Sequence, residues 1–192
     1  TQTFNVGVTT VTYIAEDGSG NKTTCSFTVS VTETVLPTIA CPANKTEKAD
    51  KDKCYAKNVN LGNPIVSDNC GVASVTNNAP SQFPVGNTIV TWTVTDNSGN
   101  TKTCLQTITV VDDQDPDIKC PKDIMVSTAP NSCTATVVLG GPQTSDNCGV
   151  APGYPTNDHP LPNYPVGTTE VTWTVKDVNG NIKTCKQKVT VE

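Results

Sequence analysis

Apolar and polar residues alternate with a period of two over residues 90–95, where Val90, Trp92 and Val94 are separated by threonines. This alternation and the β-branched composition predict a half-buried strand. The next residues, 96–100, read Asp-Asn-Ser-Gly-Asn, which is typical of a turn. A second alternating stretch follows, up to residue 110. The pattern therefore predicts a β-hairpin with one threonine-rich face toward solvent.

The same hairpin is written three times along the chain. Residues 83–104 read FPVGNTIVTWTVTDNSGNTKTC, residues 4–25 read FNVGVTTVTYIAEDGSGNKTTC, and residues 164–185 read YPVGTTEVTWTVKDVNGNIKTC. The spacing of the closing cysteines is that of a small domain and is too long for a solenoid turn. We expect two complete repeats, at 35–112 and 113–192. Residues 1–34 match only the second half of a repeat, so residue 1 is expected to lie inside a domain of a longer array.

The first half of each complete repeat is also rich in strand signals. Candidate strands begin at Cys54 and Cys133, and both end in glycine and proline. The sequence Ser-Asp-Asn-Cys-Gly-Val follows at 67–72 and again at 145–150. No segment has a convincing helical period. Several short strands with regular turn signals predict an all-β sandwich, and so small a domain buries a marginal core that disulfides are expected to staple.

Nine cysteines and a single histidine limit the chemistry of the chain. No two cysteines are spaced as CxxC, so zinc fits poorly, whereas disulfides fit well and indicate a compartment outside the reducing cytosol. Each complete repeat has four cysteines, for which the sequence alone allows three pairings. The net charge of −5 argues against a nucleic-acid partner. No apolar run in these residues is long enough to cross a membrane.

The repeated motifs resemble the hyalin repeat, or HYR domain. The resemblance rests on Cys-Pro near the start of each complete repeat, Asp-Asn-Cys-Gly in the middle, and the hairpin with its closing Thr-Cys. It implies tandem immunoglobulin-like β-sandwiches in an extracellular protein with a role in adhesion. It also implies the disulfides Cys41–Cys104 and Cys120–Cys185, which leaves Cys54–Cys70 and Cys133–Cys148 as the remaining pairs. Cys25 is then unpaired, with its partner expected in the missing half of its repeat.

No catalytic residue is expected in this chain. The histidine, His159, lies in a loop segment that has no histidine in the preceding repeat, whereas tandem copies of an enzyme site would each carry the base. The acidic run at 112–117 is instead a candidate calcium site, because calcium takes six to eight oxygen ligands. The predicted ligands are Asp113, Asp115 and Asp177, with a solvated linker and turn stabilisation as the alternatives. The corresponding junction at 33–38 has one acidic residue, so calcium is not expected equally at both junctions.

These features predict a structural or adhesive segment of an extracellular, cell-surface or secreted protein, acting as an extended stalk or filament. The expected partners are neighbouring repeats of the same chain or filament, and a partner chain could supply the strands missing beside 1–34. One alternative is that the repeats themselves bind a glycan or a surface protein. Another is that the array accompanies a catalytic domain of a secreted enzyme. Calcium is the one cofactor that the sequence suggests.

Overall fold

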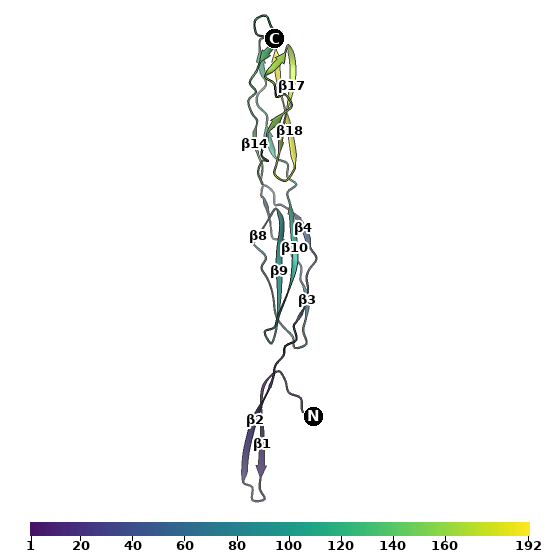
Figure 1. The fold of residues 1–192 in the computed structure, drawn as a ribbon, viewed down its shortest axis with the longest axis vertical. Coiled ribbons are helices and arrows are strands. Elements are labelled where there is room, and N and C mark those ends of the chain that lie inside the picture. Colours follow the sequence, from purple (N-terminus) through teal and green to yellow (C-terminus); the bar gives the residue numbers. More distant parts are fainter. The chain divides into compact units, whose positions relative to one another are not determined.

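A computed structural model describes all residues from Thr1 to Glu192, and it contains strands and no helix (Figure 1). The predicted all-β fold class is therefore confirmed. No helix with the length and hydropathy of a membrane span is present. The chain divides into two compact units, and each disulfide and acidic cluster described below lies inside one of them. The first unit contains Thr1–Ala43, Gly62–Ala79 and Val90–Gln106, and the second contains Asn44–Leu61, Pro80–Ile89 and Thr107–Glu192.

Three long antiparallel hairpins occupy the positions that the alternating pattern predicts. They are β1 (Gly7–Glu16) with β2 (Lys22–Val31), β9 (Gly86–Asp96) with β10 (Thr101–Val111), and β17 (Gly167–Lys176) with β18 (Ile182–Val191). The registers of the first and last hairpins agree, because Tyr13 lies opposite Cys25 and Trp173 lies opposite Cys185.

The two complete repeats have the same topology, and we call β3–β10 the second repeat and β11–β18 the third repeat. Each has a four-stranded sheet, in which the edge strand next to the last strand is parallel to it, together with two short antiparallel ladders. In the second repeat the further strands are β3 (Thr38–Ala40), β4 (Lys45–Lys48), β5 (Tyr55–Lys57), β6 (Ile65–Ser67), β7 (Val72–Asn77) and β8 (Gln82–Pro84), with the sheet order β4-β10-β9-β7 and the ladders β3-β6 and β5-β8. In the third they are β11 (Asp117–Lys119), β12 (Ile124–Val126), β13 (Thr134–Thr136), β14 (Gln143–Ser145), β15 (Thr156–Asn157) and β16 (Asn163–Pro165), with the sheet order β12-β18-β17-β15 and the ladders β11-β14 and β13-β16.

A buried tryptophan and glutamine pair lies in the core of each complete repeat. The indole Nε1 of Trp173 donates to Oε1 of Gln187 at 3.0 Å, and Nε2 of Gln187 donates to the carbonyl of Lys122 at 2.7 Å. Trp92 and Gln106 form the equivalent bond at 3.1 Å. Both glutamines are almost fully buried. Because buried amides must be hydrogen-bonded, each pair links the hairpin to the segment beside it at a defined register.

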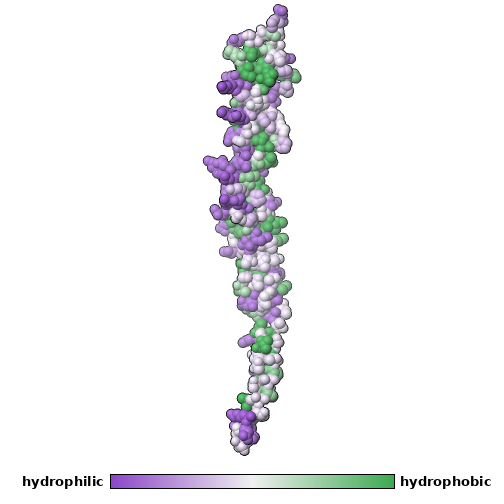
Figure 2. Space-filling model, turned by 90° about the vertical axis from the view of Figure 1, so that its left-hand side faces the viewer, coloured by the Kyte–Doolittle hydropathy of each residue, from purple (hydrophilic) through white to green (hydrophobic).

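The first hairpin differs from the other two because no other strands cover its aromatic side chains. Trp92 and Trp173 are each 6% exposed, whereas Tyr13 at the equivalent position is 62% exposed and stacks on Phe27. Tyr13 has the same place in the repeated hairpin as the two tryptophans but is exposed, because β1 and β2 form a two-stranded sheet without facing strands. Elsewhere, exposed apolar side chains are dispersed, and Figure 2 shows them as separate patches between hydrophilic surface on the face drawn.

Three disulfides are present, and one of them differs from the expected pairing. Cys41–Cys104 and Cys120–Cys185 each join the start of a repeat to its last strand. The third bond is Cys54–Cys148, which joins the second repeat to the third, so the expected pairs Cys54–Cys70 and Cys133–Cys148 do not form. Cys25, Cys70 and Cys133 are free and exposed.

The position of Asn147 accounts for this pairing. Its Nδ2 donates to the carbonyl of Lys53 at 3.0 Å, which places the following residue, Cys148, beside Cys54. Within the second repeat, by contrast, Cys54 precedes β5 and Cys70 follows β6, and these strands belong to different ladders. The repeat period conceals this arrangement, because each of these cysteines has an equivalent in the neighbouring repeat.

We predict that Gln187→Leu destabilises the protein by roughly 1–3 kcal/mol, because the Trp173 indole and the Lys122 carbonyl lose their partner inside the core. The free energy of unfolding from urea titrations measures the loss. Gln143→Leu is the matched control, since Gln143 is exposed on β14. Equal effects of the two substitutions would show that the buried hydrogen bonds contribute nothing specific.

We also predict that the double substitution Cys54→Ser with Cys148→Ser lowers the free energy of unfolding by roughly 2–4 kcal/mol, because it releases a long closed loop in the unfolded chain. The control is Cys70→Ser with Cys133→Ser, which changes the same residue types but breaks no bond. An unchanged urea midpoint for the first variant would contradict the Cys54–Cys148 staple.

Candidate metal centre

Three carboxylates from separate segments meet at the start of the third repeat. Their oxygen atoms, on Asp112, Asp146 and Asp177, lie within 4.8 Å of one another. Asp112 directly follows β10, Asp146 directly follows β14, and Asp177 directly follows β17. The ends of three strands therefore place the three carboxylates close together.

Burial makes this cluster of charges costly. Asp112 is 9% exposed and Asp177 is 1% exposed. Two like charges at this separation repel by about 3 kcal/mol at an effective dielectric constant of about 20. The Oδ2 atoms of Asp112 and Asp146 are buried and accept no hydrogen bond. Buried carboxylate oxygens without donors are unusual, so this site has unused capacity for a positively charged ligand.

Hydrogen bonds hold the three carboxylates in place from outside the cluster. The Oδ1 atom of Asp146 accepts from the backbone amides of Cys148 and Gly149, each at 2.8 Å. Asp177 accepts from the amide of Asn181, whose side chain donates to Oδ2 of Asp177 and to the carbonyl of Asp112. The repeated Asp…Gly-Asn turn thus stabilises the hairpin, as one sequence alternative holds, and also ties the chain at Asp112 to that turn.

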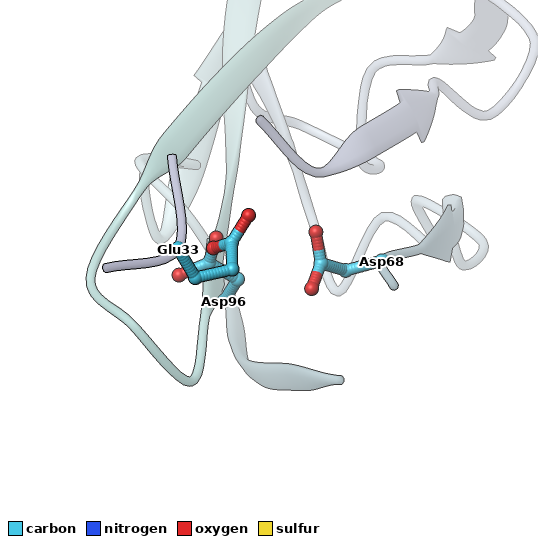
Figure 3. A group of neighbouring side chains, drawn as sticks. All are labelled: Glu33, Asp68 and Asp96. Atoms are coloured by element: carbon cyan, nitrogen blue, oxygen red, sulfur yellow. The ribbon is translucent and has the colours of Figure 1, made fainter. Parts of the chain in front are cut away.

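The same arrangement occurs a second time, in the other compact unit. Oxygen atoms of Glu33, Asp68 and Asp96 lie within 4.8 Å of one another, and Figure 3 shows the Asp68 carboxylate facing the Glu33 and Asp96 pair. Asp68 corresponds to Asp146, and its Oδ2 is also buried without a partner. Asn100 donates to Glu33 Oε2 and to Asp96 Oδ2, both at 2.8 Å. Recurrence with a different acid at one position indicates that the cluster depends on charge and oxygen donors.

The predicted ligand set agrees with this site only in part. Asp177 lies in the cluster, but Asp113 lies outside it and forms an ion pair with Lys48. Asp115 lines a hollow next to the cluster, together with Asp52 and Asp146. Asp112 begins the predicted acidic run but was not among the named ligands, and neither were Asp146 and Glu33. The signal that identifies them is the repeat itself, because Glu33 and Asp112 occupy equivalent positions in successive repeats, as do Asp68 and Asp146.

The chemistry of these donors favours a hard cation. Both clusters offer only carboxylate oxygens, and no histidine or free cysteine sulfur is among them. Calcium accepts six to eight oxygens in flexible geometry, and carbonyls and water complete its shell when three carboxylates are available. Zinc prefers nitrogen and sulfur ligands. The residues present therefore fit calcium.

His159 packs against other side chains of the third repeat. Its ring stacks on the buried Tyr164 with a centroid distance of 5.6 Å, and its Nδ1 lies 3.8 Å from Oδ1 of Asp158. Burial raises the pKa of the Tyr164 phenol, with the Asp158 carboxylate adding to the shift. The histidine therefore packs against a core aromatic.

The electrostatics of the Asp96 turn generate a prediction for acid. Burial alone raises the pKa of Asp96, but hydrogen bonds from Asn100 and from the amide of Ser98 outweigh it, so the pKa lies below its usual value. A depressed folded-state pKa stabilises the fold above the unfolded pKa of about 3.9, and this stability is lost as pH falls through the folded value. In a chelator, we expect the melting temperature to fall as the pH drops below about 5, and to fall less in Asp96→Asn. The control is Asp52→Asn, at an exposed site, and it is expected to lose melting temperature with falling pH as steeply as the unmodified chain. The assignment would be contradicted if Asp96→Asn were as steep as the unmodified chain, or if Asp52→Asn were as shallow as is expected of Asp96→Asn.

Comparison with known proteins agrees with the repeat and its motifs. The HYR domain family profile matches residues 1–31, 32–110 and 111–191. The chain is 36% identical to "Hyalin" of Strongylocentrotus purpuratus over 197 residues, covering 98% of this chain, and 36% identical to "Hyalin" of Lytechinus variegatus over 187 residues, covering 93% of it. It spans 16% and 35% of the lengths of these two relatives.

More distant similarities extend to an adhesin and to cadherin repeats. "Serine-rich adhesin for platelets" of Staphylococcus aureus is 31% identical over 108 residues, which cover 51% of this chain and 5% of that protein. The solved structure of protocadherin gamma C5 EC1-3 covers 95% of this chain and 77% of its own, with 14% identity and a TM-score of 0.41. The family profile and the two hyalins carry the assignment: this chain belongs to the HYR domain family.

Proposed function

We propose that this chain is a calcium-binding segment of an extracellular, adhesion-type array, in which the HYR repeats act as a stalk or filament. The family and the hyalin and adhesin relatives support the adhesion-type role. Three disulfides support an oxidising compartment outside the cytosol. We further propose that the partners are neighbouring repeats at a cell surface or in a secreted matrix.

The observation that carries the calcium proposal is the unpaired oxygen of a buried carboxylate. Asp112 is about nine-tenths buried, its Oδ2 has no donor, and Asp146 and Asp177 lie around it. A bound cation removes the repulsion among these groups. It also links the residue that enters the third repeat to two loops of that repeat, because Asp112, Asp146 and Asp177 follow three different strands.

Such a link supports a mechanical role. Without a cation, the segment at Asp112 is held by the hydrogen bonds from Asn147 and Asn181 at 3.1 and 3.2 Å. With one, charge–charge contacts add to those bonds, so the entry to the repeat resists bending more strongly. Calcium sites of extracellular modules have dissociation constants of about 10⁻⁴–10⁻³ M, so we propose that the segment is ordered outside the cell and loosened where calcium is scarce.

We predict that calcium at about 100 times its dissociation constant stabilises the protein by roughly 2.7 kcal/mol for each site whose binding is coupled to folding. Calorimetric titration and melting curves in calcium and in chelator measure the effect. Asp146→Asn is expected to abolish binding at the third-repeat cluster, and Asp68→Asn is expected to abolish it at the other. Magnesium is expected to bind more weakly, because it demands a stricter octahedral geometry.

The matched control is Asp113→Asn, which removes an acidic residue beside Asp112 but outside the cluster. It is expected to leave calcium affinity within about twofold of the unmodified chain. No heat of binding and no shift in melting temperature with calcium would overturn the proposal. If Asp113→Asn lost as much calcium affinity as Asp146→Asn, the acidic run at 112–117, including Asp113, would be the binding site instead of the cluster.

A further inference from the structure

The bond Cys54–Cys148 joins two non-equivalent positions of the repeat. Cys54 corresponds to Cys133, and Cys70 corresponds to Cys148, since each pair occupies the same place in successive repeats. The bond therefore joins the second cysteine of the second repeat, Cys54, to the third cysteine of the third repeat, Cys148. It leaves one unused cysteine of each kind, because Cys70 and Cys133 are free and exposed.

The unused Cys70 has the same local structure as the bonded Cys148. The amide of each donates to Oδ1 of the aspartate two residues earlier, Asp68 or Asp146, at 2.8 Å in both repeats. The side-chain amide of the preceding asparagine lies 3.3 Å from the sulfur of Cys70 and 3.5 Å from that of Cys148. The loop is thus already in the conformation that forms the bond elsewhere in the chain.

The unused Cys133 likewise has the structure of the bonded Cys54. Each directly precedes a three-residue strand, β13 or β5. The carbonyl of Cys133 accepts from the amide of Val166 at 3.1 Å, and that of Cys54 accepts from the amide of Val85 at 3.2 Å. Neither repeat bonds its own two cysteines of this set. The chain therefore presents both halves of a bond for which it contains one completed example.

We propose that Cys70 and Cys133 are the open half-sites of a continuous series of disulfides between adjoining HYR repeats. Cys133 bonds to the Asp-Asn-Cys cysteine of a following repeat, and Cys70 bonds to the strand-preceding cysteine of a repeat before it. The partner is an HYR repeat with the same cysteine set, in the same longer chain or in a neighbouring molecule. The proposal rests on the extracellular location proposed above but is independent of calcium.

The chemistry of each bond is an ordinary thiol–disulfide exchange. The thiolate of Cys133 attacks a low-molecular-weight disulfide such as oxidised glutathione and releases one glutathione thiolate. The partner cysteine then attacks the mixed disulfide and releases the second. Two protein thiols are oxidised to one disulfide, one glutathione disulfide is reduced to two thiols, and the two thiol protons pass to the released thiolates.

The test extends the chain by one repeat. Because Glu192 aligns with Val111, a second copy of residues 112–191 is fused directly after Glu192, and the product is folded in a glutathione redox buffer. Free thiols are alkylated, and disulfides are mapped by mass spectrometry without reduction. We expect a bond between Cys133 and the Cys148 of the appended copy, so that Cys133 is no longer alkylated and the free thiols are Cys25, Cys70 and the appended Cys133.

Two outcomes would overturn the proposal. One is alkylation of both Cys133 and the appended Cys148 in a chain that has formed Cys120–Cys185, which serves as the check on folding. The other is a bond between Cys133 and Cys148 of its own repeat. Cys148→Ser in the appended copy alone is the matched control, and it is expected to restore full alkylation of Cys133 while Cys54–Cys148 remains.

The unextended chain distinguishes the two sources of the partner. Covalent multimers on a non-reducing gel that disappear with Cys133→Ser assign the partner to a neighbouring molecule. A monomeric chain, together with the expected bond in the extended chain, assigns it to the same chain. The maps are made in calcium and in chelator, so a failure of calcium binding is seen separately from a failure of the disulfide.

Discussion

Repulsion among carboxylates that are forced together is the constraint on which the start of the third repeat depends. Asp112, Asp146 and Asp177 approach within 4.8 Å because each follows a strand whose position the sheet determines. The backbone amides and asparagine side chains around them satisfy some of the oxygens and leave two without donors. The fold thus maintains a concentration of negative charge that a cation can neutralise, and it does so at two places.

Asn147 connects this electrostatic site to the covalent structure. Its side-chain amide donates both to Oδ1 of Asp112 and to the carbonyl of Lys53, and Lys53 and Asn147 each precede a cysteine of the Cys54–Cys148 bond. The disulfide and the acidic cluster therefore share one loop, Asp-Asn-Cys. A bound cation would restrict this loop from one side, while the disulfide restricts it from the other. We infer that the two devices reinforce each other.

Much of the fold follows from period-two alternation, because a half-buried strand requires it. Val90, Trp92 and Val94 are buried as that pattern predicts. Tyr13 has the same pattern but is exposed, since alternation identifies the face of a strand and does not supply the strands that cover it. The Cys54–Cys148 bond could not be predicted from the sequence for a similar reason. A repeat specifies equivalent positions, but it does not specify whether bonds form within one copy or between successive copies.

The metal ligands were only partly predictable, because aspartate serves two purposes in these loops. Asp146 accepts backbone amides through Oδ1, as any turn aspartate does, and only the three-dimensional structure reveals that its Oδ2 is buried without a partner. The most direct test is a crystal structure of the chain grown in calcium, with anomalous diffraction data. Calcium neutralisation of the cluster predicts an anomalous peak about 2.3–2.6 Å from carboxylate oxygens of Asp112, Asp146 and Asp177. The absence of such a peak, with these oxygens bound to protons, amides or water instead, would contradict it.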